Sequence, residues 1–263
     1  MSWLTEVFGT PRPLIGVVHL RPLPGSPRYE GDLEEVLRHA RRSALALKEA
    51  GFHGIVLENY GDVPFFPETV PPHVACLAAV LVKEFSELLP CGINLLRNAA
   101  SQALAAAFAG GGSFIRVNVH VGAVVADQGL LAGKAHETLR YRSQIGARVR
   151  ILADIAVKHA QALVARDPLQ EALDCVERGL ADGLIVTGPR TGTPADLSLA
   201  KRLREALPRI PIFAGSGVTA ATVRETIKVV DGIIVGTALE NEPGVIDPQK
   251  ARAFVKAVGA HEA

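Results

Sequence analysis

Eight short apolar segments, each followed by a segment with helical periodicity, constrain the fold of this chain more than any other feature. Most of these segments are continuous apolar runs, which is typical of parallel strands that are covered on both faces. Parallel strands need a crossover connection, usually a helix, and the intervening segments supply it. The predicted strands span residues 14–20, 54–59, 92–96, 114–119, 149–155, 183–187, 210–214 and 232–236.

The segments between the predicted strands have the spacing of amphipathic helices. In residues 32–50, apolar residues recur every three or four positions, with arginine and lysine opposite them. Residues 167–180 open with Asp167 and Pro168, a helix N-cap followed by proline at the first helical position. Thr219 precedes a further predicted helix that ends near residue 229.

Eight strand–helix units without a break in composition indicate an α/β protein with a closed (β/α)8 barrel, the TIM barrel. The alternative is an open doubly wound sheet, but no G-x-G-x-x-G fingerprint follows the first strand. A chain of 263 residues fits one barrel, and no linker divides it. We therefore expect a single domain over residues 1–263. The longest connection on the expected site face, residues 120–134, is a candidate lid.

Composition and charge argue against several classes of protein. With 28 basic and 27 acidic residues the net charge is +1, so no general attraction to nucleic acid or an anionic membrane is expected. The N-terminus lacks the pattern of a signal peptide, and the most apolar stretch is too short to span a bilayer. Cys76, Cys91 and Cys175 are odd in number and widely spaced. We interpret them as buried thiols in a reducing cytosol, and we expect a cytoplasmic protein.

Polar side chains gather where the predicted strands end. In a barrel, the C-terminal ends of the strands and the loops that follow them surround one pocket. The middles of the strands are apolar, so this coincidence of polar ends predicts a binding site. The candidates are His19, Glu58, Asn59, Asn94, Arg97, Arg116, Asn118, Asp154, Lys158, His159 and Thr187, with Asp127 and Gln128 in the long connection.

Glycine-rich turns follow the last three predicted strands. Glycines let backbone N–H groups approach phosphate oxygens, and barrels often bind phosphate with the loops after strands seven and eight. The alternative is that these glycines only form tight turns. We predict a phosphate site formed by Gly188, Thr191, Gly192, Gly215, Ser216, Gly217, Gly236 and Thr237.

The catalytic candidates are Glu58, Asp154, Lys158 and His19. A carboxylate in a barrel mouth can abstract a proton, and a lysine there can act as a base or form a Schiff base. The alternative for both carboxylates is a structural ion pair with Arg97 or Arg116. Lys158 is equally compatible with a solvated loop lysine.

A metal is not signalled by the sequence. His19, Glu58, Asp62 and Asp154 could jointly hold a divalent ion, but no H-x-H or H-E-x-x-H spacing exists. We expect no resident cofactor and no protein-held metal. One metal hypothesis stays open, namely Mg²⁺ that enters the site bound to a phosphorylated substrate.

Several long motifs carry a resemblance to a known family. They include IGVVHLRPLPGSPRY at residues 15–29, GIVLENYGDVPF at 54–65, ILADIAVKHA at 151–160 and FAGSGVT at 213–219. The chain resembles the BtpA/SgcQ family from about residue 14 to the end of the eighth strand. The resemblance implies a TIM barrel similar to ribulose-phosphate-binding barrels. It also implies a connection with photosystem I accumulation in one branch and with sugar-utilisation genes in another. Pro189 and Arg190 depart from the small residues expected there.

Three functions are compatible with these residues. The first is an enzyme with isomerase or lyase chemistry on a small phosphorylated sugar or ribosyl-type metabolite. The second, which the resemblance suggests, is a non-catalytic assembly or stability factor for a photosynthetic or membrane complex. The third is a regulatory barrel that binds a metabolite. The expected partner is a phosphorylated small molecule, with no nucleic acid and no transmembrane segment. A homo-oligomer is allowed, because barrels often pair through their outer helices.

Overall fold

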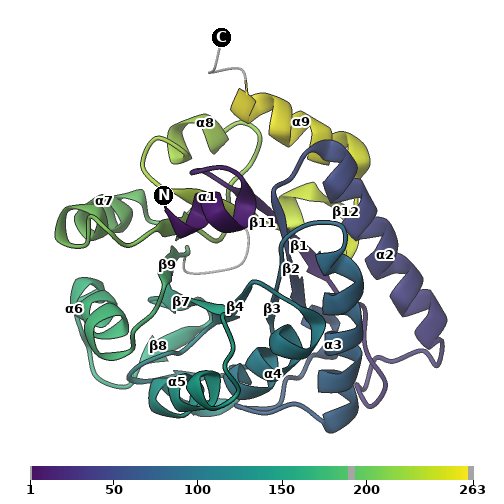
Figure 1. Ribbon diagram of the computed structural model, residues 1–263, viewed down its shortest axis with the longest axis horizontal. Coiled ribbons are helices and arrows are strands. Elements are labelled where there is room, and N and C mark those ends of the chain that lie inside the picture. Colours follow the sequence, from purple (N-terminus) through teal and green to yellow (C-terminus); the bar gives the residue numbers. More distant parts are fainter. Residues whose placement is uncertain (1, 189–192, 260–263) are drawn as a thin grey trace.

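The computed structural model describes residues 2–188 and 193–259, and its centre is a closed barrel of eight parallel strands (Figure 1). Neighbouring strands around the barrel follow each other in sequence, and the last pairs with the first, Leu14 lying opposite Ile233. All eight predicted strands are confirmed. They are β1 Leu14–His19, β2 Gly54–Glu58, β3 Cys91–Asn94, β4 Phe114–Val117, β7 Arg150–Ile155, β9 Gly183–Val186, β10 Ile212–Ala214 and β11 Gly232–Val235.

Helices surround the barrel on its outside (Figure 1). The helix predicted at 32–50 is confirmed. The Asp32 side chain caps its N-terminus by accepting from the Glu35 N–H at 2.9 Å, and Gly51 ends it in the left-handed conformation. The outer helices are α2 Leu33–Ala50, α3 Pro72–Ser86, α4 Ala100–Gly110, α5 Ala135–Gln144, α6 Pro168–Leu173, α7 Leu197–Ala206, α8 Val223–Thr226 and α9 Pro248–Gly259.

Two helix predictions need correction. Residues 167–180 do not form one regular helix, since α6 ends at Leu173 and a π-helical turn, η2 Asp174–Arg178, follows it. The helix expected directly after Thr219 is reduced to α8. Thr219 and Thr222 hydrogen-bond to each other through backbone and side chain. Because this local turn competes with helical hydrogen bonds, the helix begins only at Val223.

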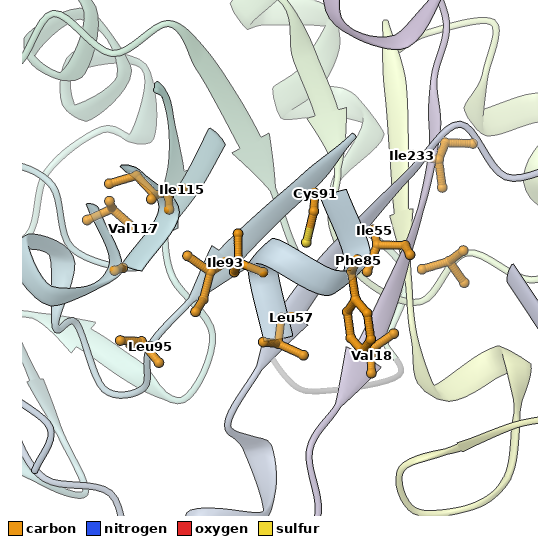
Figure 2. Packing of buried hydrophobic residues seen from close by; sticks show 14 of the residues in the cluster. Val18, Ile55, Leu57, Phe85, Cys91, Ile93, Leu95, Ile115, Val117 and Ile233 are labelled. Carbon is orange, nitrogen blue, oxygen red and sulfur yellow. The ribbon is translucent and has the colours of Figure 1, made fainter. Parts of the chain in front are cut away.

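Strand alternation divides the apolar core into two layers. Ile15 and Val17 of β1 belong to the cluster inside the barrel, whereas Leu14 and Val18 belong to the layer between strands and helices. Figure 2 shows part of this outer layer, in which Phe85 of α3 lies near Val18 of β1 and Ile55 of β2, with side chains of β3 and β4 farther along the sheet. The inner cluster comprises Ile15, Val17, Val56, Phe114, Leu152, Ile185, Phe213 and Ile234, together with Leu4 and Phe8 of α1 Trp3–Phe8.

Helix α1 closes the N-terminal end of the barrel. The Phe8 ring lies 5.8 Å from Phe114, and the Trp3 ring lies 6.5 Å from Phe213. Arg142 and Arg150 pair with Asp182 at this end, at 2.8 and 3.0 Å. The pocket is therefore confined to the opposite, C-terminal end of the strands.

Two small antiparallel sheets extend the C-terminal end of the barrel. The connection 120–134 contains a β-hairpin, β5 Ala123–Ala126 and β6 Gly129–Ala132, and β8 Ala160–Ala162 pairs with β5. We call these three strands the flap sheet; the candidate lid is thus ordered structure. After β11, the turn η3 Thr237–Leu239 leads into the hairpin β12 Glu240–Glu242 and β13 Val245–Ile246.

The cysteine prediction is correct for two residues and wrong for the third. All three are free thiols, and Cys91 and Cys175 are buried, but Cys76 is exposed on α3. The buried stripe of α3 runs through Val74, Ala78 and Leu81, and Cys76 lies off it. Within residues 2–188 and 193–259, no helix has the length and apolarity needed to cross a bilayer.

Candidate active site

The alternation that fills the barrel also selects the polar residues of its mouth. On β1, Ile15 and Val17 face inward, so His19 takes the next inward position. The same step beyond the apolar layer falls on Glu58 in β2 and on Asp154 in β7. These inward terminal positions are His19, Glu58, Asn94, Arg116, Asp154 and Thr187, all of them buried, and then Gly215 and Gly236 after β10 and β11.

Arg116 of β4 is the centre of the buried charge cluster. Its Nη1 lies 3.2 Å from Glu58 Oε1, and its Nη2 lies 3.0 Å from Asp154 Oδ1. Two amides complete the cluster. Asn94 donates to Glu58 Oε1 at 3.1 Å, and Asn118 donates to Asp154 Oδ2 at 2.7 Å. Both carboxylates therefore make the ion pair named as their alternative role, with Arg116 rather than Arg97.

These contacts determine the charge of the cluster. Burial alone would raise the pKa of Glu58, but Arg116 and His19 outweigh it, so the pKa lies well below its usual range. Burial lowers the pKa of Arg116, but Asp154 and Glu58 more than restore it. Glu58 is therefore ionised near neutral pH and is a weak proton acceptor in the ligand-free protein.

His19 is held between two carboxylates. Its Nδ1 lies 2.6 Å from Glu240 Oε1, and its Nε2 lies 3.6 Å from Glu58 Oε2. The Tyr60 ring packs against it with a centroid distance of 4.7 Å. Burial lowers the pKa of His19, but the hydrogen bonds with Glu240 and Glu58 outweigh this effect and raise the pKa to about 9. His19 is thus a protonated, hydrogen-bond-donating group at neutral pH.

NMR titration of the histidine rings should find His19 titrating near pH 9, and Glu240→Gln should lower its pKa. The folded-state pKa exceeds the unfolded value of 6.5, so the stabilisation that His19 contributes is complete below pH 6.5 and is lost as the pH rises through 9. His53, whose pKa burial lowers, is the internal control and should titrate below 6.5 in both proteins. A wild-type His19 pKa at or below 6.5 would contradict the assignment.

Lys158 lies in the loop between β7 and β8. The residues around it adopt left-handed backbone conformations, with φ of 50° at Ala156 and 58° at His159. Burial, followed by the charge of Arg116, lowers the pKa of Lys158. A larger fraction of this amine is therefore neutral than in a solvated loop lysine, and this property suits a base or a nucleophile.

Two cavities meet at Lys158. The glycine-side cavity, about 210 Å³, is lined by His19 and by the turns after β10 and β11. The flap cavity, about 410 Å³, reaches Asp127 of the flap sheet and His159. Four residues line both cavities, namely Glu58, Tyr60, Arg116 and Lys158. The charge cluster therefore lies between two binding spaces.

Two glycines at inward strand ends, Gly215 and Gly236, line the glycine-side cavity at positions with no room for a side chain. A Cβ on Gly236 would lie 2.7 Å from the His19 ring, and one on Gly215 would lie 2.3 Å from Ile185. Gly217 has φ +63°, and a Cβ there would lie 2.1 Å from the Thr193 carbonyl oxygen. Such turns present N–H groups to an anion.

Several sequence candidates lie away from the two cavities. Asn59 accepts from the Leu96 N–H at 2.7 Å and so orders the β3–α4 connection. Gln128 donates to Asp127 in the hairpin turn, and Gly188 donates to the Ser216 hydroxyl at 2.7 Å. The remaining candidates are Asp154, behind Arg116; Thr187, buried with an unpartnered hydroxyl; and Thr191 and Gly192, which fall outside the described residues.

Sequence reasoning missed Tyr60 and Glu240. Tyr60 follows Glu58 by two residues and lies in η1 Tyr60–Asp62, so the strand-end rule could have included it. Glu240 is reached only through the hairpin after β11, and no sequence signal connects it to His19. Among the described residues, no group of three or more His, Cys, Asp or Glu side chains is arranged to hold a metal. Asp62 instead accepts from the Leu23 N–H at 2.8 Å.

The fold and its mouth define a TIM-barrel protein with an enzyme-like polar pocket at the C-terminal ends of its strands. The chain belongs to the BtpA family, whose profile matches residues 10–260. It is 42% identical to the photosystem I biogenesis protein BtpA of Synechocystis over 97% of this chain and 91% of the relative. It is 47% identical to an uncharacterised protein of Pyrococcus furiosus (93% and 94%), and 30% identical to the putative sgc region protein SgcQ of Escherichia coli (98% of each).

Solved structures with low sequence identity share the fold. A structure described as native KDPGal superposes with a TM-score of 0.60 at 21% identity, covering 98% of this chain and 97% of that one. Phosphoribosyl anthranilate isomerase of Thermotoga maritima gives 0.59 at 15% identity, covering 95% and 99%. Thiamine phosphate pyrophosphorylase of Pyrococcus furiosus gives 0.58 at 16% identity, covering 94% and 96%. At these identities the likeness establishes the barrel alone.

Proposed function

We propose that this protein is an enzyme that acts on a small phosphorylated sugar or ribosyl-type metabolite, with isomerase or lyase chemistry. One observation carries the proposal: Lys158, Arg116 and Glu58 lie where a glycine-lined cavity meets a second cavity. A phosphate bound at the glycine turns would place the carbon chain of the substrate across this junction. The names of two structural neighbours, a phosphoribosyl anthranilate isomerase and a thiamine phosphate enzyme, are in keeping with this substrate class.

The residues of the junction divide the chemistry between them. In the proposed reaction, neutral Lys158 abstracts a proton next to the substrate carbonyl or condenses with that carbonyl as a Schiff base. His19, protonated at neutral pH, and Arg116 then stabilise the negative charge that develops on oxygen. Glu58 and Asp154 keep Arg116 and His19 charged and in place. Mg²⁺ carried in on the substrate phosphate is compatible with this scheme.

A binding experiment on Gly217 tests the phosphate site. In Gly217→Ala, the added methyl group would clash with the Thr193 carbonyl oxygen, and the alanine backbone would have to adopt a φ of +63°. We expect inorganic phosphate and ribose 5-phosphate to raise the melting temperature of the wild type and to have little effect on this variant. Gly9→Ala is the matched control, because Gly9 also has positive φ (+71°) but open space around it. It should cost about 1 kcal/mol of stability and keep the phosphate effect.

If phosphate no longer raised the melting temperature of either Gly217→Ala or Gly9→Ala, general destabilisation would be the cause. Retention in both would overturn the phosphate site. The reaction itself is tested by turnover of a panel of phosphorylated pentoses and hexoses, with Lys158→Met as the inactive reference. A panel member converted equally by both proteins would contradict the assignment of Lys158.

A second candidate function is a non-catalytic binding factor, in keeping with the name of the Synechocystis relative. The flap sheet favours it, since Val125 and Leu130 lie opposite each other and are 47% and 58% exposed. Serine at both positions should abolish partner binding if this function holds. Turnover by the purified protein, unchanged by these substitutions, would favour the enzyme.

The cellular setting belongs to the same proposal. Free, buried thiols at Cys91 and Cys175 suit a reducing compartment, and we propose a cytoplasmic protein. We also propose that residues 1–263 act as one domain and assemble as a homo-oligomer through the outer helices.

A further inference from the structure

Arg97 is a buried cation that forms no direct ion pair with any described carboxylate. Its residue is 6% exposed, and its backbone is fixed by hydrogen bonds with Phe66 (3.0 Å) and Glu68 (2.7 Å). Its Nη2 donates to the Lys158 carbonyl oxygen at 2.8 Å, while Nε has no partner. No described carboxylate forms an ion pair with it, and burial lowers the pKa of the guanidinium. A neutral donor could bond to the Lys158 carbonyl at a smaller desolvation cost, so this hydrogen bond does not account for the positive charge of Arg97.

Arg116 and His19 form direct ion pairs with buried carboxylates, whereas Arg97 and Lys158, beside the flap cavity, form none among the described residues. Arg116 is matched by Glu58 and Asp154, and His19 is matched by Glu240. Asp154 and Glu58 attract Arg97, but the direct ion pairs of both carboxylates are with Arg116. Asp127 attracts Arg97, but it is exposed at the hairpin turn, where water screens the attraction.

The flap cavity also presents an unused acceptor. Asn118 donates through its amide nitrogen to Asp154, and its Oδ1 is buried without a partner. Asn118 and Arg97 both line this cavity. A cation and a neutral acceptor together suit a carboxylate that carries a neighbouring hydroxyl, with the carboxylate on Arg97 and the hydroxyl donating to Asn118.

We propose that the substrate is a phosphorylated sugar acid, with its phosphate in the glycine-side cavity and a carboxylate bound by Arg97 in the flap cavity. This inference rests on the proposed function and narrows its substrate class. The two cavities share a wall at Lys158, so a chain anchored at both ends presents its middle carbons to the amine. Two fixed ends would also restrict the substrate to a narrow range of chain lengths.

Matched pairs of ligands test the carboxylate. Each pair has the same carbon chain and phosphate and differs only in a terminal carboxylate or alcohol: 4-phosphoerythronate with erythritol 4-phosphate, 5-phosphoribonate with ribitol 5-phosphate, and 6-phosphogluconate with glucitol 6-phosphate. Calorimetry should give, for at least one chain length, a roughly ten- to hundredfold tighter binding of the acid, since hydrogen bonds to charged groups carry this energy. In Arg97→Met, the acid and the alcohol should bind alike, with the alcohol affinity unchanged.

Two controls keep the outcomes distinct. Arg142→Met removes an arginine paired with Asp182 at the opposite end of the barrel, so it should lower stability and keep the acid preference. Arg97→Lys should retain part of the preference. An acid-to-alcohol ratio near one at every length, or a preference that survives Arg97→Met, would overturn the carboxylate while leaving phosphate binding intact. If neither the six compounds nor inorganic phosphate binds, the proposed function fails together with this inference.

Discussion

Arg116→Met is expected to destabilise the protein by about 3–5 kcal/mol, the usual cost of breaking a buried ion pair on one side. The side chain of Arg116 is 3% exposed, and its removal leaves the carboxylates of Glu58 and Asp154 buried without their cation. Each must then be protonated or admit water. The measurement is the free energy of unfolding in urea near neutral pH.

Two further variants separate the charge effect from lost packing. Glu58→Gln and Asp154→Asn, added to Arg116→Met, remove the stranded charges and should recover a large part of the loss. Lys83→Met breaks an exposed pair with Glu87 and should change the free energy by about 0.5 kcal/mol or less. If Arg116→Met costs no more than Lys83→Met, the cluster does not hold the charges described.

Pyridoxal 5′-phosphate with borohydride should modify Lys158 faster than exposed lysines such as Lys83. The reagent combines an aldehyde, which condenses only with a neutral amine, and a phosphate that fits the glycine-side cavity. Burial, followed by the charge of Arg116, lowers the pKa of Lys158, so a larger fraction of its amine is neutral at pH 7 than in a solvated lysine. Peptide mapping by mass spectrometry after brief labelling at pH 7 provides the measurement.

The labelling has controls for each part of the argument. Inorganic phosphate should protect Lys158 and leave Lys83 unprotected. Gly217→Ala should slow the labelling of Lys158 without affecting Lys83, because Lys158 itself is intact. Equal labelling rates for the two lysines in the wild type would show that Lys158 is an ordinary solvated amine.

Local sequence was sufficient to predict the barrel. Each strand is a short apolar run, and helix α2 has its cap, its stripe and its terminal glycine within one continuous segment. The predicted helices were wrong in two places where local hydrogen bonds compete with regular helical ones, at Thr219 and in the π-helical turn after Leu173. Cys76 was misplaced because apolar neighbours alone do not say which face of a helix is buried.

The candidate site was predictable as a set of positions and much less as a set of contacts. Period-two alternation places His19, Glu58 and Asp154 at the inward strand ends, and this follows from sequence once the strands are known. The same rule assigns Asn59 to the outward side, where it holds the Leu96 backbone. The flap sheet joins segments about 35 residues apart, and no local pattern announces that pairing.

The sequence by itself determined the eight strands, their order and the residues that end them, because secondary structure and alternation depend on near neighbours along the chain. Only the tertiary structure decided which of these residues pair. It placed Glu240 against His19 across 221 residues, assigned both buried carboxylates to Arg116 and left Arg97 without one. Ion pairing and burial depend on distances through space, and the closure of the barrel fixes those distances.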